Sequence, residues 1–199
     1  GKTLLSLLGF VLVWQFTAMW VDKSVYYPTF METFSSFCQM ARTGSFWTLA
    51  GLSLLRVLFG FALAFLLGVL LAAACSLLPA VTGFVKTVMG VAKATPVASF
   101  IILAMIWFQS SSVPVFIAVL MITPIIFENT YQGIQSIDKK TVEMCRVYRV
   151  PALVFLRKVA IPYAKPYLVA GVFTSLGMGF KAVVSAEILA RPPIGIGTS

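Results

Sequence analysis

Histidine is absent from this chain, and acidic residues are scarce. The 199 residues include 0 His and 6 Asp or Glu, against 15 Lys or Arg. Histidine is the commonest general base and metal ligand in enzymes. The sequence also has no paired carboxylates, phosphate-binding glycine loop, GxSxG elbow or HExxH helix. These absences argue against an enzyme.

The spacing of the three cysteines is also uninformative about function. Cys38, Cys75 and Cys145 lie far apart in the sequence and form no CxxC pair. The spacing indicates neither a disulfide framework nor a metal site.

What the chain has in excess is apolar sequence. Hydrophobic residues make up 60% of the chain and charged residues 11%, and the mean hydropathy is +0.98. Four apolar runs, 3–21, 46–78, 94–127 and 160–189, reach the roughly 20 helical residues that cross a bilayer. The composition is that of a membrane protein.

The third run is long enough for more than one crossing. Gln109 to Ser112 form a polar turn, and Pro114 follows directly, so we expect one helix to end near Phe108 and another to start near Pro114. We predict five spans in all: 3–21, 46–78, 82–108, 113–128 and 160–189. The first could instead be a signal peptide, but no small-residue cleavage site precedes Asp22, which favours a retained anchor.

The net charge of +9 is unevenly distributed. The predicted loop 129–159 carries six basic and two acidic residues, a net charge of +4, whereas the charges of the loop 22–45 balance. Because positive charge collects on the cytoplasmic side, we predict a cytoplasmic 129–159 loop, a cytoplasmic N-terminus and an external 22–45 loop, and no nucleic-acid partner. Phe30, Phe34 and Phe37 suggest a short helix at the external interface.

Small residues recur every four positions in two of the predicted spans. One series is Gly60, Ala64, Gly68 and Ala72, and the other is Gly171, Ser175 and Gly179. Such faces allow helices to approach closely in lipid. The pattern fits packing within the chain and equally fits a subunit interface or a sliding gate.

A few charged residues fall within the apolar runs. We expect Arg56 and Glu187, near span ends, to extend to the membrane surface. Lys93 precedes a predicted kink at Pro96, and Lys181 follows a glycine-rich stretch. We predict that five residues face a solute path: Lys93, Pro96, Ser99, Gly177 and Lys181.

The 129–159 loop is predicted to fold into two short helices. Ser136 or Asp138 can cap a helix from Lys139 to Tyr148, Pro151 suits the start of a second helix, and Pro162 is expected to open the last span. On the first helix one face is apolar, with Val142, Cys145 and Tyr148, and another is polar, with Lys139, Glu143 and Arg146. A small apolar face rimmed by charge suits docking into a soluble partner, whereas a merely solvated loop would explain the charges but not the ordered helix starts.

This segment resembles the EAA motif of ABC importer permeases. The residues that match are Glu143, Phe155, Val159, Ile161, Pro162, Ala164, Pro166 and Gly171. The runs Leu52 to Phe61, Pro96 to Phe108 and Ala186-Glu187 are similar to the nitrate, sulfonate and taurine branch. The resemblance implies that eight residues couple to an ATPase: Lys139, Lys140, Val142, Glu143, Cys145, Arg146, Tyr148 and Arg149. It implies a structural role for four more: Pro162, Ala164, Pro166 and Gly171.

The resemblance also implies an architecture and partners. It suggests an all-α, polytopic transmembrane helix bundle of the type I importer kind, a single domain over 1–199, and one further span beyond residue 199. The expected partners are a second permease copy, two ATPase subunits, a solute-binding protein and membrane lipid, in a bacterial inner membrane. ATP and Mg²⁺ would bind to the ATPase subunits, and this chain would bind no cofactor. The cargo would be a sulfonate, taurine, nitrate or a vitamin precursor. A self-contained carrier or channel is the main rival, and a membrane enzyme or insertase a weaker one.

The chain departs from the motif at the turn of the elbow. Arg149 stands where the family usually has Gly, and Val150-Pro151 replaces a small pair. A left-handed turn would strain Arg by about 1 kcal/mol or more. We therefore expect the elbow to adopt a different shape here.

Overall fold

The computed structural model describes residues 2–21 and 27–192, and every regular element in these ranges is a helix. The helices are α1 (Lys2–Val21), α2 (Phe30–Ala41), α3 (Gly44–Leu77), α4 (Pro79–Ala94), α5 (Val97–Trp107), α6 (Val113–Gln135), α7 (Lys139–Val147), α8 (Ala152–Phe155) and α9 (Ile161–Ala190), with a π-helical turn, Leu156–Ala160, before α9. Part of the predicted external loop, 22–26, lies outside the described residues, and so does the run Gly195 to Gly197, whose sequence is also similar to the nitrate, sulfonate and taurine branch. The chain forms two units, 1–48 and 49–199.

The first unit contains α1 and α2. Thr29 caps α2 through a reciprocal pair of hydrogen bonds: Glu32 N–H donates to the Thr29 hydroxyl and Thr29 N–H donates to the Glu32 carboxylate. Trp14 Nε1 donates to the Pro28 carbonyl over 3.2 Å, and the Trp14 and Phe30 rings meet edge to face at 5.7 Å. The helix predicted from the phenylalanine spacing is confirmed.

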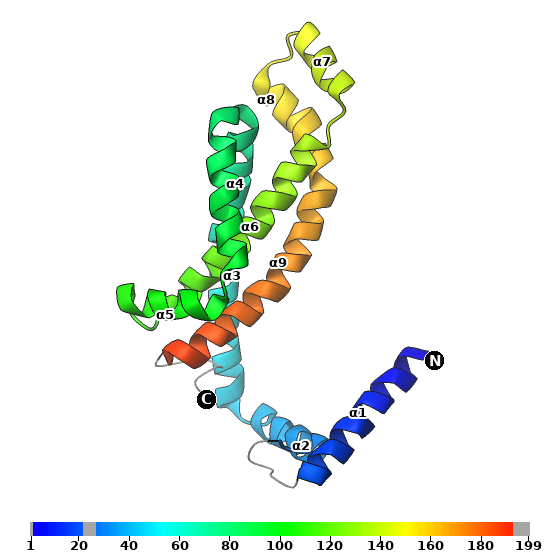
Figure 1. The fold of residues 1–199 in the computed structure, drawn as a ribbon, viewed down its shortest axis with the longest axis vertical. Helices are drawn as coiled ribbons and strands as arrows, with labels where there is room; N and C mark the ends of the chain where they lie inside the picture. Colours follow the sequence, from blue (N-terminus) through cyan, green and yellow to red (C-terminus); the bar gives the residue numbers. More distant parts are fainter. Residues whose placement is uncertain (1, 22–26, 193–199) are drawn as a thin grey trace. The chain divides into compact units, whose positions relative to one another are not determined.

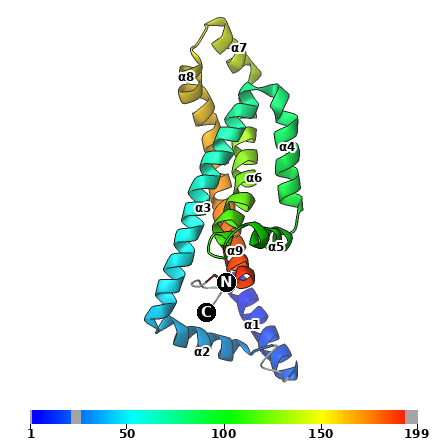
Figure 2. The same cartoon turned by 90° about the vertical axis from the view of Figure 1, so that its left-hand side faces the viewer.

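α6 is the central helix of the second unit, and it lies alongside α9 (Figure 1). In its most apolar window 61% of the residues are buried, against 28% for α3 and 28% for the helix that ends with α9. The core side chains come from α3, α5, α6 and α9, with Ile101, Ile117, Ile122, Ile126 and Val183 among those fully buried. Figure 2 shows α6 between α3 and α4.

Both small-residue faces pack against α6. A Cβ at Gly60 would lie 2.5 Å from Ala118 Cβ, and one at Gly68 would lie 2.8 Å from Ile126 Cγ2. On α9, a Cβ at Gly179 would lie 2.5 Å from Ile122 Cδ1. Since real Cβ atoms do not approach so closely, a side chain at Gly60 or Gly68 would push the helices apart, and one at Gly179 would force the Ile122 side chain to move. The contact within the chain, one of the two alternatives left open by the sequence, is therefore present at both faces.

Within the described residues, three helices are long and apolar enough to cross a membrane: Gly44–Leu77, Val113–Gln135 and Ala152–Ala190. The polar turn before Pro114 does separate two helices, since α5 ends at Trp107 and α6 begins at Val113. The span predicted at 82–108 is not one straight helix, because α4 and α5 are bent by 102° where Pro96 lacks an N–H and bars helical geometry at the preceding residue. Counting this pair as one crossing gives up to four spans, and Leu5–Trp20 is a shorter apolar helix.

Candidate functional site

The predicted elbow forms at one end of the second unit, where α7 follows α6 (Figure 1). Asp138 caps α7 by accepting a hydrogen bond from Lys140 N–H, as one of the two predicted caps. At the other end Val150 N–H donates to the Cys145 carbonyl over 2.9 Å, and Arg149 N–H donates to the Arg146 carbonyl over 3.0 Å. These two bonds make a Schellman motif, which ends the helix and reverses the chain.

Arg149 occupies the left-handed position of this motif, with φ of +46°. The elbow therefore keeps the backbone conformation that favours glycine, and the expectation of a different shape is wrong. The two hydrogen bonds of the motif and the proline that follows fix the turn strongly enough to hold a residue with a side chain there. Arg149 itself is exposed.

α7 presents an apolar tip to solvent. Val147 is 78% exposed and Tyr148 is 76% exposed, and Met144 on the preceding turn is also exposed. We call Met144, Val147 and Tyr148 the elbow tip. Its membership corrects the apolar face predicted from the sequence, because Cys145 is buried and Val142 is half-buried. Cys145 is next to Met144 in sequence but lies on a neighbouring face of the helix, which is buried. In so short a helix the amphipathic pattern does not distinguish these two faces.

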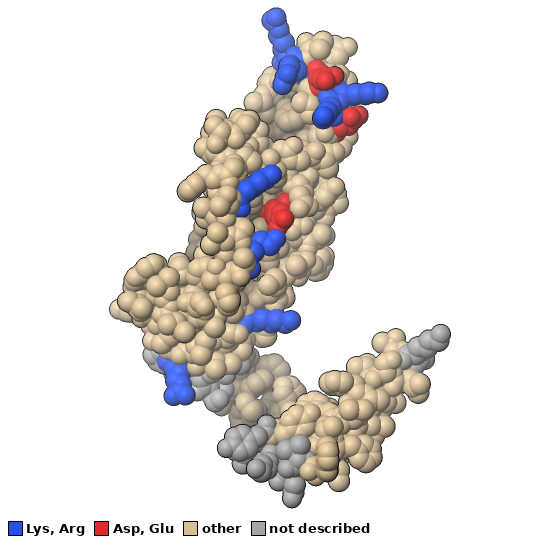
Figure 3. Space-filling model, viewed as in Figure 1, with Lys and Arg blue, Asp and Glu red and all other residues tan. Residues whose placement is uncertain are grey.

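Charged side chains surround the elbow tip. Lys139, Lys140, Glu143 and Arg146 are all exposed, and Figure 3 shows basic and acidic side chains gathered at this end of the molecule. The predicted coupling residues other than Val142 and Cys145 are thus on the surface. Their role in coupling stays a prediction.

A single continuous helix connects the elbow to the bundle. It runs from Ala152 to Ala190, with a π turn in which Ile161 N–H donates to the Leu156 carbonyl. Pro162 lies in the first turn of α9, as predicted, and α9 begins at Ile161, one residue after the predicted start at 160, although the helical path already begins at Ala152. The wider turn precedes Pro162, where the proline ring would otherwise meet a carbonyl four residues back.

This helix is packed against α6 next to the elbow. A Cβ at Gly133 would lie 2.7 Å from Ala164 Cα, and a Cβ at Gly171 would lie 3.0 Å from Asn129 Cβ. Of the four residues predicted to have a structural role, Ala164 and Gly171 are buried, whereas Pro162 and Pro166 are exposed. The role itself stays a prediction. Next to the elbow, α6 and the last helix are in close contact.

Of the five residues predicted to face a solute path, Lys93 lies in a groove. The groove runs between α4 and α6, has a volume of about 750 Å³ and is lined by Lys93 and Glu128, which form an ion pair, together with Lys86 and Tyr131. Figure 3 shows an acidic side chain between basic ones in a hollow of the surface. Pro96, Ser99, Gly177 and Lys181 are not among its lining residues. Their contact with solute stays a prediction.

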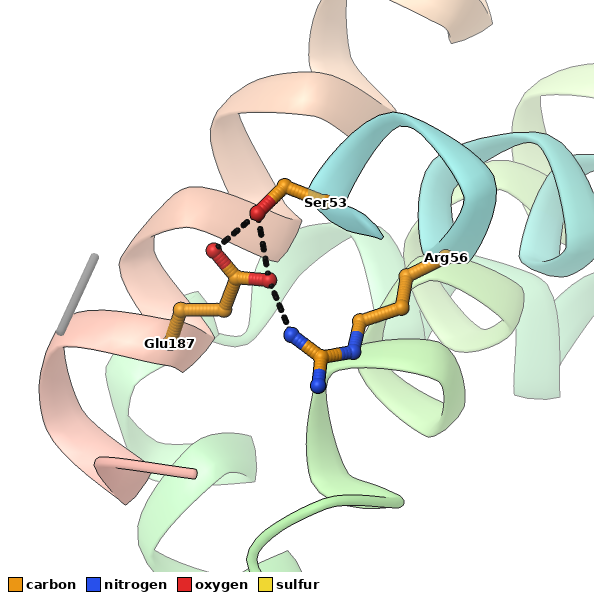
Figure 4. A network of polar contacts seen from close by, with 3 residues as sticks. All are labelled: Ser53, Arg56 and Glu187. Carbon is orange, nitrogen blue, oxygen red and sulfur yellow. Dashed lines mark hydrogen bonds and ion pairs between the residues drawn. The ribbon is translucent and has the colours of Figure 1, made fainter. Parts of the chain in front are cut away.

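A buried polar network joins α3 to α9 and was missed in the prediction from sequence. Glu187 is 0% exposed, and its Oε1 accepts from Arg56 Nη1 at 2.7 Å (Figure 4). The Ser53 hydroxyl lies 2.9 Å and 2.7 Å from the two carboxylate oxygens. The expectation that Arg56 and Glu187 extend to the membrane surface is therefore wrong. A usable signal existed, because Ser53 and Arg56 are one turn apart on α3 and a buried carboxylate needs such partners.

No group of three or more metal-ligating His, Cys, Asp or Glu side chains occurs in the described part of the chain. The described residues form a helix bundle with a protruding elbow and a charged groove.

Comparison with known proteins relates this arrangement to transport. The family described as "Binding-protein-dependent transport system inner membrane component" matches residues 64–198, more than half of the chain. The bicarbonate transport system permease protein CmpB of Synechococcus elongatus is 29% identical over 157 residues, which cover 77% of this chain and 55% of that protein. The nitrate import permease protein NrtB of Leptolyngbya laminosa is 30% identical over 156 residues, covering 77% and 55%.

A third relative extends the match along the chain. An Escherichia coli K12 protein named for the transport of aliphatic sulfonates is 27% identical over 184 residues, 91% of this chain and 70% of that protein. The chain spans only 55% of the length of the bicarbonate and nitrate permeases. The family match covers the groove, the elbow and the last helix alike. The chain therefore belongs to the binding-protein-dependent inner membrane components, the permeases of ABC importers, in the branch that includes nitrate and sulfonate permeases.

Proposed function

We propose that this chain is the transmembrane subunit of an ABC importer that carries a small oxyanion, and that it takes its energy from a separate ATPase through the elbow. The observation that carries the proposal is the elbow tip, three exposed apolar side chains on a helix that leads through one tight turn into the last helix of the bundle. Exposed apolar residues rimmed by charge favour a protein partner. The family match supplies the kind of partner.

The proposed assembly has two copies of this chain, two ATPase subunits and a solute-binding protein. In this assembly ATP and Mg²⁺ bind the ATPase subunits, and this chain has no catalytic role. Five spans and a cytoplasmic N-terminus complete the proposed topology. The positive charge around α7 supports its placement on the cytoplasmic side.

The proposed cargo class rests on the relatives. Two of them are named for bicarbonate and nitrate and a third for sulfonates, and all three solutes are oxyanions. Taurine is itself an aliphatic sulfonate and falls within this class, whereas vitamin precursors, which the sequence resemblance also admits, receive no support from these names.

Coupling would proceed by rigid transmission. When the ATPase subunits close, α7 is displaced, and the continuous helix from Ala152 to Ala190 carries the movement into the bundle. The close contacts of Ala164 with Gly133 and of Gly171 with Asn129 move α6 along with α9.

Replacing the elbow tip with serine tests the proposal. In the variant M144S/V147S/Y148S we expect at least a tenfold loss of co-purifying ATPase subunit, at unchanged yield of the permease in the membrane. The matched control is R157S/K158S, which removes two exposed charges close by but leaves the elbow tip apolar. Normal ATPase recovery with the triple variant would refute the docking role. Loss in the control alone would show that charge, not the apolar tip, recruits the partner.

A self-contained carrier predicts a different result. It would move solute into vesicles that contain this chain without any ATPase subunit. Uptake of nitrate or bicarbonate under those conditions would overturn the proposal.

A further inference from the structure

The groove between α4 and α6 is built from one face of each helix. Glu128, Tyr131, Gln132 and Gln135 lie on a common face of α6, at positions three, four and seven apart. Lys86 and Lys93 lie seven residues apart on α4, so their Cα atoms are separated by about 10 Å along the helix. The polar side chains of the groove therefore converge from two rigid elements rather than from loops.

The charges in the groove do not cancel. Lys93 is paired with Glu128, and both side chains are about half exposed, at 47% and 46%. Lys86 is not in an ion pair within the described residues, and its Nζ lies 4.3 Å from the centre of the Tyr131 ring. Two cations and one carboxylate leave a net charge of +1 in the groove. A bound group with a single negative charge would neutralise it.

The rest of the lining fits an anion with a small apolar part. Gln132, Gln135 and the Tyr131 hydroxyl can donate hydrogen bonds to oxyanion oxygens. Met89, Ala94 and Phe127 supply apolar surface in the same groove. A group with two negative charges would exceed the net charge of +1, and a neutral solute would leave it uncompensated.

We infer that this groove binds one monoanionic oxyanion group, such as a sulfonate, with Lys86 and Lys93 as its cationic ligands. Glu128 holds Lys93 in the empty groove and is displaced from it by the anion. The inference rests on the proposed function, because it takes the transported solute as the source of the anion. It adds to that function a site and the residues that form it.

The test uses the permease bound to its ATPase subunits, in nanodiscs of phosphatidylcholine, titrated with ethanesulfonate in a calorimeter. We expect K86Q and K93Q each to weaken binding about tenfold. We expect E128Q to strengthen binding severalfold, because the carboxylate no longer competes for Lys93 or repels the anion. A gain of affinity cannot arise from misfolding, so E128Q keeps the test decisive even if a lysine variant is unstable. K165Q is the matched control, since Lys165 is exposed, does not line the groove and is not among the residues predicted to face the solute path, and its affinity should equal the wild type.

Several results would overturn the inference. These are the absence of ethanesulfonate binding to the wild type, weaker binding by E128Q, an equal loss in K165Q, or equal binding of the uncharged analogue ethyl methyl sulfone. Displacement of ethanesulfonate by phosphatidylglycerol in the nanodisc would assign the groove to a lipid headgroup and overturn the solute as its occupant. If binding fails while ATPase subunits still co-purify through the elbow tip, only this inference is lost. If both fail, the proposed function falls with it.

Discussion

Glu187 illustrates how a buried charge is tolerated in this chain. Removing a carboxylate from water costs several kcal/mol unless it is paired and hydrogen-bonded. Here Arg56 supplies the charge and Ser53 the hydrogen bond, both from α3. The partners are 131 and 134 residues away in the sequence, which is why residue order alone indicated a surface position for Glu187.

Removal of Arg56 should therefore be far more harmful than removal of the whole pair. We expect R56M to lower the free energy of unfolding by about 3 to 5 kcal/mol, because it leaves Glu187 buried without its counter-charge. The double variant R56M/E187M should recover most of this loss, since no charge is then buried. Equilibrium unfolding of the purified chain in detergent measures both. Equal losses in the single and double variants would show that the pair does not matter electrostatically.

Arg149 gives the opposite case, a residue whose replacement should help. Its φ of +46° costs about 1 to 2 kcal/mol for a residue with a Cβ. We expect R149G to raise the free energy of unfolding of the elbow by about 1 kcal/mol, less the greater chain entropy of glycine in the unfolded state. Hydrogen exchange of the α7 amides would report this local change. R149Q is the control, because it removes the charge but keeps the Cβ, and protection in R149Q equal to that in R149G would attribute the gain to charge.

At the scale of helices, glycines allow α3 and α9 to pack closely against α6. A Cβ at Gly60 would come within 2.5 Å of Ala118 Cβ, whereas a Cβ at Gly51 on the same helix would have nothing within 4 Å. We expect G60L to destabilise the bundle by about 1 to 3 kcal/mol or more through overpacking, and G51L to be neutral or slightly stabilising through better helix propensity. Unfolding in detergent compares the two. Similar stabilities for G60L and G51L would mean that α3 does not pack on α6 as described.

The helices show what sequence patterns can and cannot predict. The cap at Asp138 and the small-residue faces follow from local chemistry and spacing, and both are present. Pro162 lies in the first turn of α9 as predicted, but the pattern did not show that the preceding short helix continues into α9 through a π turn, which makes room for the proline ring. The pairing of Lys93 with Glu128 was missed for a different reason. A contact between two helices depends on the rotation of each helix about its own axis. A mostly apolar run without strong polar alternation does not predict that rotation.

At the scale of the whole molecule, the membrane topology depends on the path of the chain between α3 and α6. α4 and α5 together are apolar enough to cross a membrane, yet they meet at 102°. They can form one broken crossing or a re-entrant segment that returns to the side it came from. The two cases put the Gln109 to Ser112 turn on opposite sides of the membrane, and the proposed topology requires the broken crossing.

Cysteine labelling in sealed vesicles separates these cases. In a chain whose natural cysteines are replaced by serine, we place single cysteines at the exposed positions Ala80, Ser111 and Lys140, which follow α3, α5 and α6 respectively. Position 140 is a better probe of the elbow than Cys145, which is buried. If α4 and α5 make one crossing, a membrane-impermeant maleimide should reach A80C and K140C from the cytoplasmic side and S111C from the opposite side. Because α6 crosses in either case, S111C and K140C must always differ, which serves as the internal control. Labelling of S111C and A80C from the same side would make the pair re-entrant and would remove one span from the proposed topology.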